Sequence, residues 1–319
     1  MATQTKTSAP PIKLQAQDAL PPESGLLKRA GRRFLKHRMA VIGGFILLAI
    51  FIFVIGGTFF FTEREANFND TSIRLLSPSS AYPLGTDTLG RNLLPRLVYG
   101  GQISLIIGVL SVIMSIAIGT TVGLVAGYYG GILDAILMRF VEAMLSIPTL
   151  LLLLVMARYF SGKIPEITIL GRSLSGSVVV IIVIIGLTGW TGLSRIVRSN
   201  VLSLRESEFV SAARALGASN FRIIMVHILP NTVAPVIVST TLGVAGAILS
   251  EAYISFLGLG VQPPTATWGN MLQDARQYID NAPWLWIFPG LMIVLTVMSI
   301  NFVGDGLRDA LDPRSDNRA

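Results

Sequence analysis

The chain has 319 residues, of which 52% are hydrophobic and 13% are charged, and its formal net charge is +7. Ordinary globular domains carry about 25% charged residues, so this composition excludes a water-soluble globular protein and indicates an integral membrane protein. The basic residues lie beside hydrophobic segments instead of forming one basic surface with interleaved aromatics, which argues against nucleic-acid binding. Cysteine is absent and only His37 and His227 represent histidine, so we expect no disulfide and no metal site.

The N-terminal part divides into two segments. Residues 1–25 are rich in Gln, Pro, Ser and Thr and cannot bury enough apolar surface to become ordered, so they predict a disordered cytoplasmic tail. In residues 26–38, apolar side chains recur at helical spacing among cations. This pattern predicts an amphipathic basic helix in the membrane interface, and a simple basic flank of the first span is the alternative.

Six apolar segments approach the ~20 residues that a helix needs to cross a bilayer. They cover residues 39–61, 103–127, 140–160, 177–193, 232–257 and 284–303. The first segment lacks a small-residue cleavage site, so we interpret it as a retained span and not a signal peptide. The sequence therefore predicts an all-α membrane protein with six transmembrane helices.

Basic residues near the spans define the orientation, because they stay on the cytoplasmic side. Six cations, with no acidic residue among them, directly precede the first span: Lys28, Arg29, Arg32, Arg33, Lys36 and Arg38. Alternation then places the loop 194–230 inside, and this loop carries five arginines against Glu206 and Glu208. The segment 62–101 is balanced in charge and is expected outside, and the tail 306–319 inside. Both termini are thus expected in the cytoplasm.

Small residues follow one face of the second span. They recur every three or four positions at Ser104, Gly108, Ser111, Ser115, Gly119, Gly123 and Gly127. Such spacing lets helix backbones approach closely. It has two interpretations: tight packing within the bundle, or a helix beside a translocation path, in which case Ser111 and Ser115 line that path.

Charged residues are nearly absent from the span centres, where each costs about 2.5 to 3.5 kcal/mol on insertion scales. Glu251 is a charged residue within the fifth span. It lies far along that span, so we expect it near the outer boundary of the membrane. It is a candidate contact for substrate or a gate. The alternative is an interfacial carboxylate bonded to a neighbouring helix.

The loop 208–231, EFVSAARALGASNFRIIMVHILPN, is too long for a turn between two spans. Ser203 and Glu206 have the spacing of a capping box, and the following helix places four apolar residues on one face: Phe209, Ala212, Ala213 and Leu216. Gly217 is expected as a left-handed cap, and Ser219 begins the next helix. The result is a helix–glycine–helix elbow, which serves either to dock another protein or as an intramolecular lid.

The same residues carry a family resemblance. Ser211, Ala212 and Ala213, then Gly217, then Leu229 and Pro230 resemble the E-A-A…G…I-x-L-P loop of bacterial ABC import permeases. That family uses the loop as a coupling helix on its ATPase subunit. The resemblance implies this role for Glu208, Phe209, Ser211, Ala212, Ala213, Leu216, Gly217, Leu229 and Pro230. Ser211 stands where the family often has Glu, and Glu208 lies one turn earlier.

Three further motifs resemble the dipeptide/oligopeptide/nickel branch of that family, on its C-type side. They are YPLGTDTLGRNLLPRLVYGGQISL at 82–105, EAYISFLGLG at 251–260 and NFVGDGLRDALDPR at 301–314. Asn92 replaces the usual Asp in the first. The resemblance implies the fold of a type I ABC importer permease, with the permease core at 102–305.

The resemblance also implies a non-enzymatic transport subunit in a bacterial or archaeal cytoplasmic membrane. The chain has no G-x-x-x-x-G-K-[ST] loop to hold ATP, so ATP and magnesium belong to partner subunits and no cofactor is expected here. The implied partners are a homologous B-type permease, two ABC ATPases, an extracytoplasmic substrate-binding protein and the lipid bilayer. Di- or oligopeptides are the expected substrates, with nickel chelates or oligosaccharides as alternatives.

Two other classes of protein make different predictions. A secondary transporter or channel predicts buried ionisable groups, broken helices or an inverted repeat. A membrane-embedded hydrolase predicts a nucleophile with a base or metal ligands inside the spans. The sequence shows neither pattern convincingly.

Overall fold

The computed structural model describes residues 26–160, 162–169 and 172–311, which form a helical bundle. Its helices are α1 Leu26–Lys36, α2 Arg38–Gly56, α3 Glu63–Asn67, α4 Leu93–Tyr129, α5 Gly131–Ser146, α6 Thr149–Phe160, α7 Gly176–Arg205, α8 Glu208–Ala215, α9 Asn220–Arg222, α10 Leu229–Phe256, α11 Trp268–Ala275 and α12 Trp284–Leu311. Strands β1 (Ile167–Ile169) and β2 (Arg172–Leu174) pair antiparallel in a small ribbon that the sequence did not predict. The predicted tail at 1–25 and residues 312–319 lie outside the described residues.

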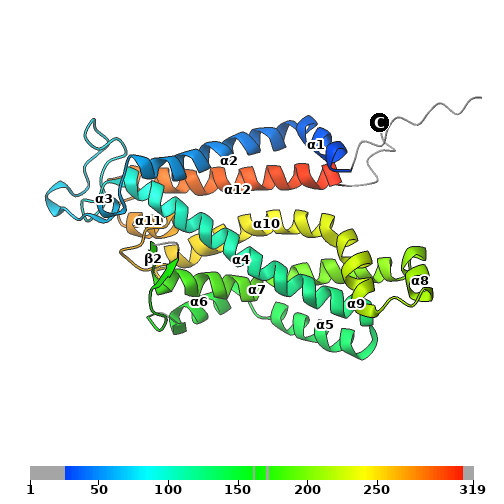
Figure 1. Cartoon of the computed structure of the whole chain (residues 1–319). Coiled ribbons are helices and arrows are strands. Elements are labelled where there is room, and N and C mark those ends of the chain that lie inside the picture. Colours follow the sequence, from blue (N-terminus) through cyan, green and yellow to red (C-terminus); the bar gives the residue numbers. More distant parts are fainter. Residues whose placement is uncertain (1–25, 161, 170–171, 312–319) are drawn as a thin grey trace, which may run out of the picture.

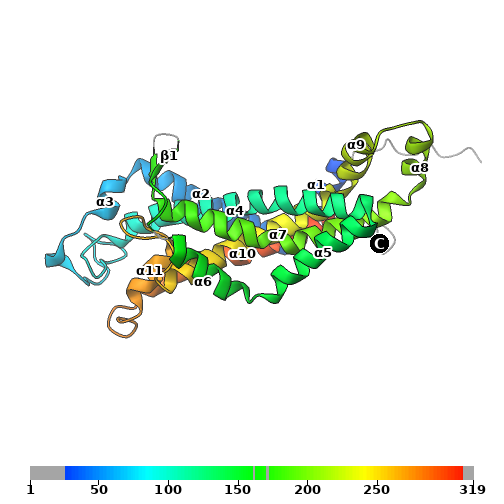
Figure 2. The ribbon, with the colours of Figure 1, turned by 90° about the horizontal axis from the view of Figure 1, so that it is seen from below.

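Five helices in the described residues are long and apolar enough to cross a membrane, and there are six if the bent pair α5 and α6 counts as one span. The predicted all-α membrane fold is therefore confirmed, with five to six apolar spans. Figure 1 shows α1, the end of α12 and the α8–α9 connection at one end of the bundle, and α3, α11 and the ribbon at the other. Figure 2 shows the same division from below. We call these the elbow end and the distal end.

The third span differs from the straight helix predicted at 140–160. Helices α5 and α6 meet at an angle of 84°, with the break at Ile147 and Pro148. Proline disfavours the helical conformation of the residue before it, and Ile147 is extended, with φ −84° and ψ 126°. Hydropathy alone therefore predicted the apolar content of this span but not its shape.

Two other helices extend beyond their predicted limits. Helix α4 has 37 residues and is about 55 Å long, so it reaches past a ~30 Å hydrocarbon core. Helix α12 continues to Leu311, through part of the predicted tail at 306–319. Gly306 lets α12 pack closely on α1 and α2, because an added Cβ would overlap Cβ of Ala40 on α2 and lie 3.2 Å from the ring of Phe34 on α1.

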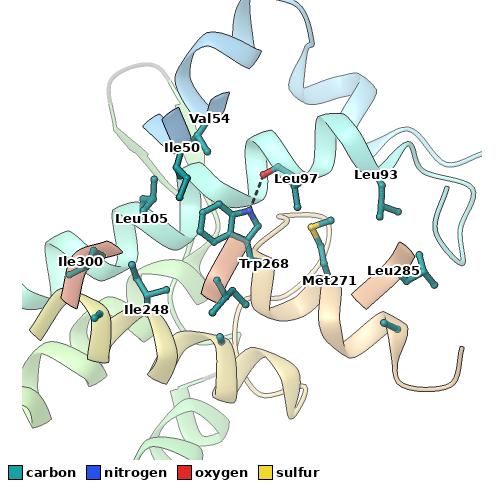
Figure 3. Close-up of a cluster of buried hydrophobic side chains, with 14 of the residues drawn as sticks. Ile50, Val54, Leu93, Leu97, Leu105, Ile248, Trp268, Met271, Leu285 and Ile300 are labelled. Atoms are coloured by element: carbon teal, nitrogen blue, oxygen red, sulfur yellow. Dashed lines mark hydrogen bonds between the residues drawn. The ribbon is translucent and has the colours of Figure 1, made fainter. Parts of the chain in front are cut away.

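The largest apolar cluster joins the distal helix α11 to the spans (Figure 3). Trp268 at the start of α11 is fully buried, and its Nε1 donates a 3.0 Å hydrogen bond to the carbonyl oxygen of Leu97 on α4. The surrounding side chains come from four spans: Ile50, Val54, Leu105, Ile248 and Ile300. Helix α11 is thus anchored in the bundle, although it does not cross the membrane.

The small-residue face of α4 packs against α7 and α10. A Cβ added at Gly119 or Gly123 would lie 2.8 or 2.7 Å from backbone oxygens of α7, and one at Gly108 would lie 2.7 Å from Ile248 on α10. Backbone contact of this kind requires residues without a side chain. The packing interpretation of this face is confirmed.

The motif at 82–105 forms the turn that starts α4. Oδ1 of Asp87 accepts 2.9 Å hydrogen bonds from the backbone N–H groups of Leu89 and Arg91, while Gly90 adopts φ +73°. The guanidinium of Arg91 bridges Asp87 and Asp274 on α11, the latter at 2.9 Å. Asn92 caps α4 by accepting a bond from the Leu94 N–H at 3.1 Å. Because Asn and Asp are equivalent N-caps, the departure from the family motif does not alter this turn.

Candidate functional site

The elbow begins where α7 ends at Arg205. The predicted capping box of Ser203 and Glu206 is wrong, because Ser203 lies inside α7 and Ser207 occupies the N-cap position of α8. The hydrophobic helix α7 extends further than its apolar segment suggested. The hydroxyl of Ser207 bonds the carbonyl oxygen of Leu204 instead of an N–H of α8.

Two of the predicted cap residues hold the other end of the elbow. Gly217 has φ +81°, the left-handed conformation expected for a C-cap glycine, and its N–H donates to the Arg214 carbonyl oxygen at 3.0 Å. Ser219 caps α9 by accepting a 3.3 Å bond from the N–H of Arg222. The helix–glycine–helix shape is confirmed.

The inner face of the elbow has its own apolar core. Val210 and Ala213 of α8 are buried against the ends of α4 and α7 and against three isoleucines of the return segment: Ile223, Ile224 and Ile228. The predicted exposed face therefore needs one correction, because Ala213 faces inward. Val210 and Ala213 together form the buried face of α8, whereas Ala212, which the periodicity placed on the same face as Ala213, is exposed.

The outer face of the elbow presents apolar side chains to its surroundings. Leu216 is 88% exposed, Phe221 73% and Phe209 43%. Glu208, Ser211, Ala212 and Pro230 are also exposed, and Leu229 is half-buried. The elbow is a knob with an apolar core on its inner side and exposed apolar side chains on its outer side.

A π-helical turn, Ile223–Ile228, joins α9 to α10, and the sequence did not predict it. The side-chain amide of Asn231 donates a 2.6 Å hydrogen bond to the carbonyl oxygen of His227 where this turn passes into α10. Such turns are often found at functional sites. Here the turn lets both Ile223 and Ile228 point into the elbow core.

A cavity of about 270 Å³ lies between α4, α6, α7 and α10. Its walls carry small and hydroxyl-bearing residues, and none of the described residues that line it is charged: Val112, Ser115, Ile116, Thr149, Leu153, Ile185, Thr188, Gly189, Leu193, Ser239, Thr240, Gly243, Gly246, Ala247 and Ser250. Oγ1 of Thr240 is buried without a hydrogen-bond partner among the described residues. A second cavity toward the elbow end, of about 580 Å³, shares Ser239 with the first.

The three predicted path residues have different positions. Ser115 lines the cavity and donates a 3.0 Å hydrogen bond to the Gly186 carbonyl oxygen. Ser111 is fully buried and donates to the Ile182 carbonyl oxygen at 3.2 Å. Glu251 is 1% exposed and accepts a hydrogen bond from Ser104 on the neighbouring helix α4, while Ser250 beside it lines the cavity.

Most of the cavity residues were not predicted from the sequence. On α10 they include Ser239, Gly243, Gly246 and Ser250, which recur every three or four positions. This is the same signal that marked the second span. It could have identified the cavity face of α10.

A multi-span helical bundle with an uncharged internal cavity and an apolar knob at one end has the organisation of a membrane-transport subunit. Two family models match the chain: "Binding-protein-dependent transport system inner membrane component" over residues 119–317, and "N-terminal TM domain of oligopeptide transport permease C" over residues 25–78. The chain belongs to the family of binding-protein-dependent transport inner membrane components, and is a multi-pass protein of the bacterial inner membrane.

Individual relatives cover nearly the whole chain. The dipeptide transport system permease protein DppC of Alkalihalophilus pseudofirmus is 40% identical over 317 residues, covering 96% of this chain and 97% of the relative. The oligopeptide transport system permease protein OppC of Haemophilus influenzae is 39% identical over 293 residues, covering 91% and 89%. A solved structure of the MetNI methionine ABC transporter shares the fold with a TM-score of 0.54, at 22% identity over 68% of this chain and 96% of that one.

Proposed function

We propose that this chain is the C-type permease subunit of an ATP-driven importer of di- and oligopeptides. The main observation is the elbow, whose inner face is cored by Val210 and Ala213 and whose outer face exposes Leu216. An exposed apolar side chain on a rigid, separately cored knob has the properties of an interface anchor. The knob docks on an ABC ATPase, which binds ATP and magnesium and hydrolyses the ATP; this chain itself binds no cofactor.

The positive charge of the elbow end supports a cytoplasmic location for it. Alongside the arginines of α7 and α8, exposed Arg32 and Lys36 on α1 lie at this end. The distal end, with α3 and α11, then faces the outside, where a substrate-binding protein delivers the peptide. The ATPase pulls on the elbow in one nucleotide state and not in the other, which shifts the bundle between two conformations.

The cavity suits a peptide better than an ion. Its hydroxyl groups offer hydrogen bonds to a peptide backbone, and the buried Oγ1 of Thr240 has none within the described chain. The absence of charge among its described lining residues accommodates peptides with different side chains. The relatives DppC and OppC are named for dipeptide and oligopeptide transport, which supports the same substrate class. A homologous B-type permease completes the path from the opposite side.

Co-purification of the assembled transporter tests the proposal. Leu216→Glu should remove the apolar anchor without affecting folding, because the side chain is 88% exposed. We expect this variant to lose the ATPase subunits and ATP-dependent peptide uptake. Phe68→Glu is the matched control, since Phe68 is a 63% exposed apolar residue of the distal end and should leave ATPase binding unchanged. Retention of the ATPases by Leu216→Glu would contradict the proposal.

A further inference from the structure

Both ends of the elbow are bonded to a single turn of α4. Arg205, the last residue of α7, donates from Nη1 to the carbonyl oxygens of Gly127 and Tyr128 at 3.4 and 3.3 Å. The hydroxyl of Tyr128 donates a 2.8 Å hydrogen bond to Oδ1 of Asn220, the first residue of α9. The elbow therefore leaves and re-enters the bundle on the last turn of α4, a helix that is not adjacent to it in the chain.

These contacts are built into the interior of the elbow. Tyr128 is 6% exposed and belongs to the same apolar cluster as Val210 and Ala213. The last carbonyl groups of a helix lack partners within the helix and carry partial negative charge, so the guanidinium of Arg205 is well placed against them. A Cβ at Gly127 would lie 2.7 Å from Cβ of Val201, so α4 and α7 are in close contact at this turn.

Helix α4 connects this turn with the rest of the molecule. Along its length, Ser115 lines the cavity, and at its distal start Arg91 bonds Asp274 on α11. The turn after α4 is fixed as well, because Asp134 of α5 accepts a 2.6 Å hydrogen bond from Nη2 of Arg198 on α7. A displacement of the elbow is thus applied directly to a wall of the cavity.

We propose that Tyr128 and Arg205 are positioning residues that join both ends of the elbow to α4, so that elbow movement shifts the cavity wall formed by α4. Helices α7 and α10 are covalently continuous with the elbow, whereas α4 contacts it through these two side chains and through the apolar cluster around Tyr128, and packs along α7. This inference rests on the proposed function, because the movement comes from the ATPase.

Tyr128→Phe tests it with minimal disturbance, since the ring stays in the apolar cluster and only the hydroxyl is removed. In the complete transporter with its binding protein, we expect peptide uptake per ATP hydrolysed to fall about fivefold, the factor that one ordinary hydrogen bond contributes to an equilibrium. Tyr129→Phe is the matched control: Tyr129 is 53% exposed, and its hydroxyl bonds no described residue. It should transport like the unaltered chain.

A mutant cycle with Asn220→Ala sharpens the test. Asn220→Ala alone should reproduce the loss, and adding Tyr128→Phe should lower coupling no further, because both changes remove the same bond. Equal coupling in Tyr128→Phe and Tyr129→Phe would overturn the inference. Loss of the ATPase subunits from Tyr128→Phe would overturn it too, since the tyrosine would then serve assembly.

The two proposals fail in different ways. If Leu216→Glu keeps the ATPases bound, the docking role of the elbow is wrong. If Leu216→Glu releases them while Tyr128→Phe couples normally, only the role of α4 is wrong.

Discussion

The hydroxyl of Ser104 on α4 donates a 3.1 Å hydrogen bond to the carboxylate of Glu251 on α10, across 147 positions of sequence. The same hydroxyl accepts a 3.2 Å bond from the N–H of Trp268, and Ser255 donates to the other carboxylate oxygen at 2.7 Å. All four residues are buried. One side chain of α10 thereby holds together α4, α10 and the start of α11.

Glu251→Ala should destabilise the protein by about 1 to 3 kcal/mol, because it leaves the hydroxyl groups of Ser104 and Ser255 buried with a lost partner. Glu251→Gln keeps one carbonyl acceptor and should lose less. Thermal unfolding in detergent measures both. Ser250→Ala is the control, since that hydroxyl bonds only the Gly246 carbonyl oxygen of its own helix. An unfolding midpoint for Glu251→Ala equal to that of the control would refute this role.

Gly123→Ala should destabilise the α4–α7 interface by about 1 to 3 kcal/mol through overpacking. The new methyl group would lie 2.6 Å from Cβ of Val197 and 2.7 Å from the Ser194 carbonyl oxygen. Gly44→Ala makes the same chemical change on α2, where no atom lies within 4 Å of the new Cβ. Its unfolding midpoint should stay the same or rise. Equal unfolding midpoints for Gly123→Ala and Gly44→Ala would contradict a backbone contact between α4 and α7 at Gly123.

Asp87→Ala should cost about 3 to 5 kcal/mol, the range for removing one partner of a buried ion pair. Asp87 is 3% exposed and bonded to Arg91, which is 4% exposed. Glu142→Ala removes the exposed pair with Arg139 and should cost no more than about 1 kcal/mol. Denaturation of both variants under the same conditions gives the comparison, and similar losses would mean that the distal turn is not held by its buried charges.

Gly217→Val should clearly reduce ATP-coupled uptake while it changes the unfolding midpoint only slightly. A Cβ added at position 217 meets no atom within 4 Å, so the penalty comes from φ +81°, which β-branched residues disfavour strongly. Gly217→Asn should retain more uptake, because asparagine tolerates this conformation. Uptake and unfolding midpoints of the two variants are the measurements. Equal uptake in both would show that the left-handed cap has no part in coupling.

Local signals in the sequence predicted the parts of the elbow that depend on local chemistry. Gly217 and Ser219 are caps whose conformation follows from their own backbone, and the apolar spans follow from composition. Ser203 and Glu206 matched a capping box only by spacing, because α7, packed against α4, continues through Ser203 to Arg205 and Glu206 is its C-cap. Pro148 contained the signal for the break in the third span, which an average over apolar residues conceals.

Other parts depend on residues far apart in the chain. Glu251 bonds Ser255 one turn later on α10 and Ser104 on α4, and the partner on α4 could not be assigned from the spacing around Glu251. The bond between Tyr128 and Asn220 joins positions 92 apart. Both arise from helix packing, which determines which polar groups are buried together.

The most direct test is to measure on which side of the membrane position 216 lies and whether the ATPases cover it. The chain contains no cysteine, so Leu216→Cys and Phe68→Cys each introduce a single thiol. With a membrane-impermeant maleimide, we expect Phe68→Cys to react in intact cells and Leu216→Cys to react only in opened membranes from which the ATPases have been removed. Reaction of Leu216→Cys in intact cells, or its full reaction with the ATPases in place, would contradict the proposal that the elbow is the cytoplasmic docking site.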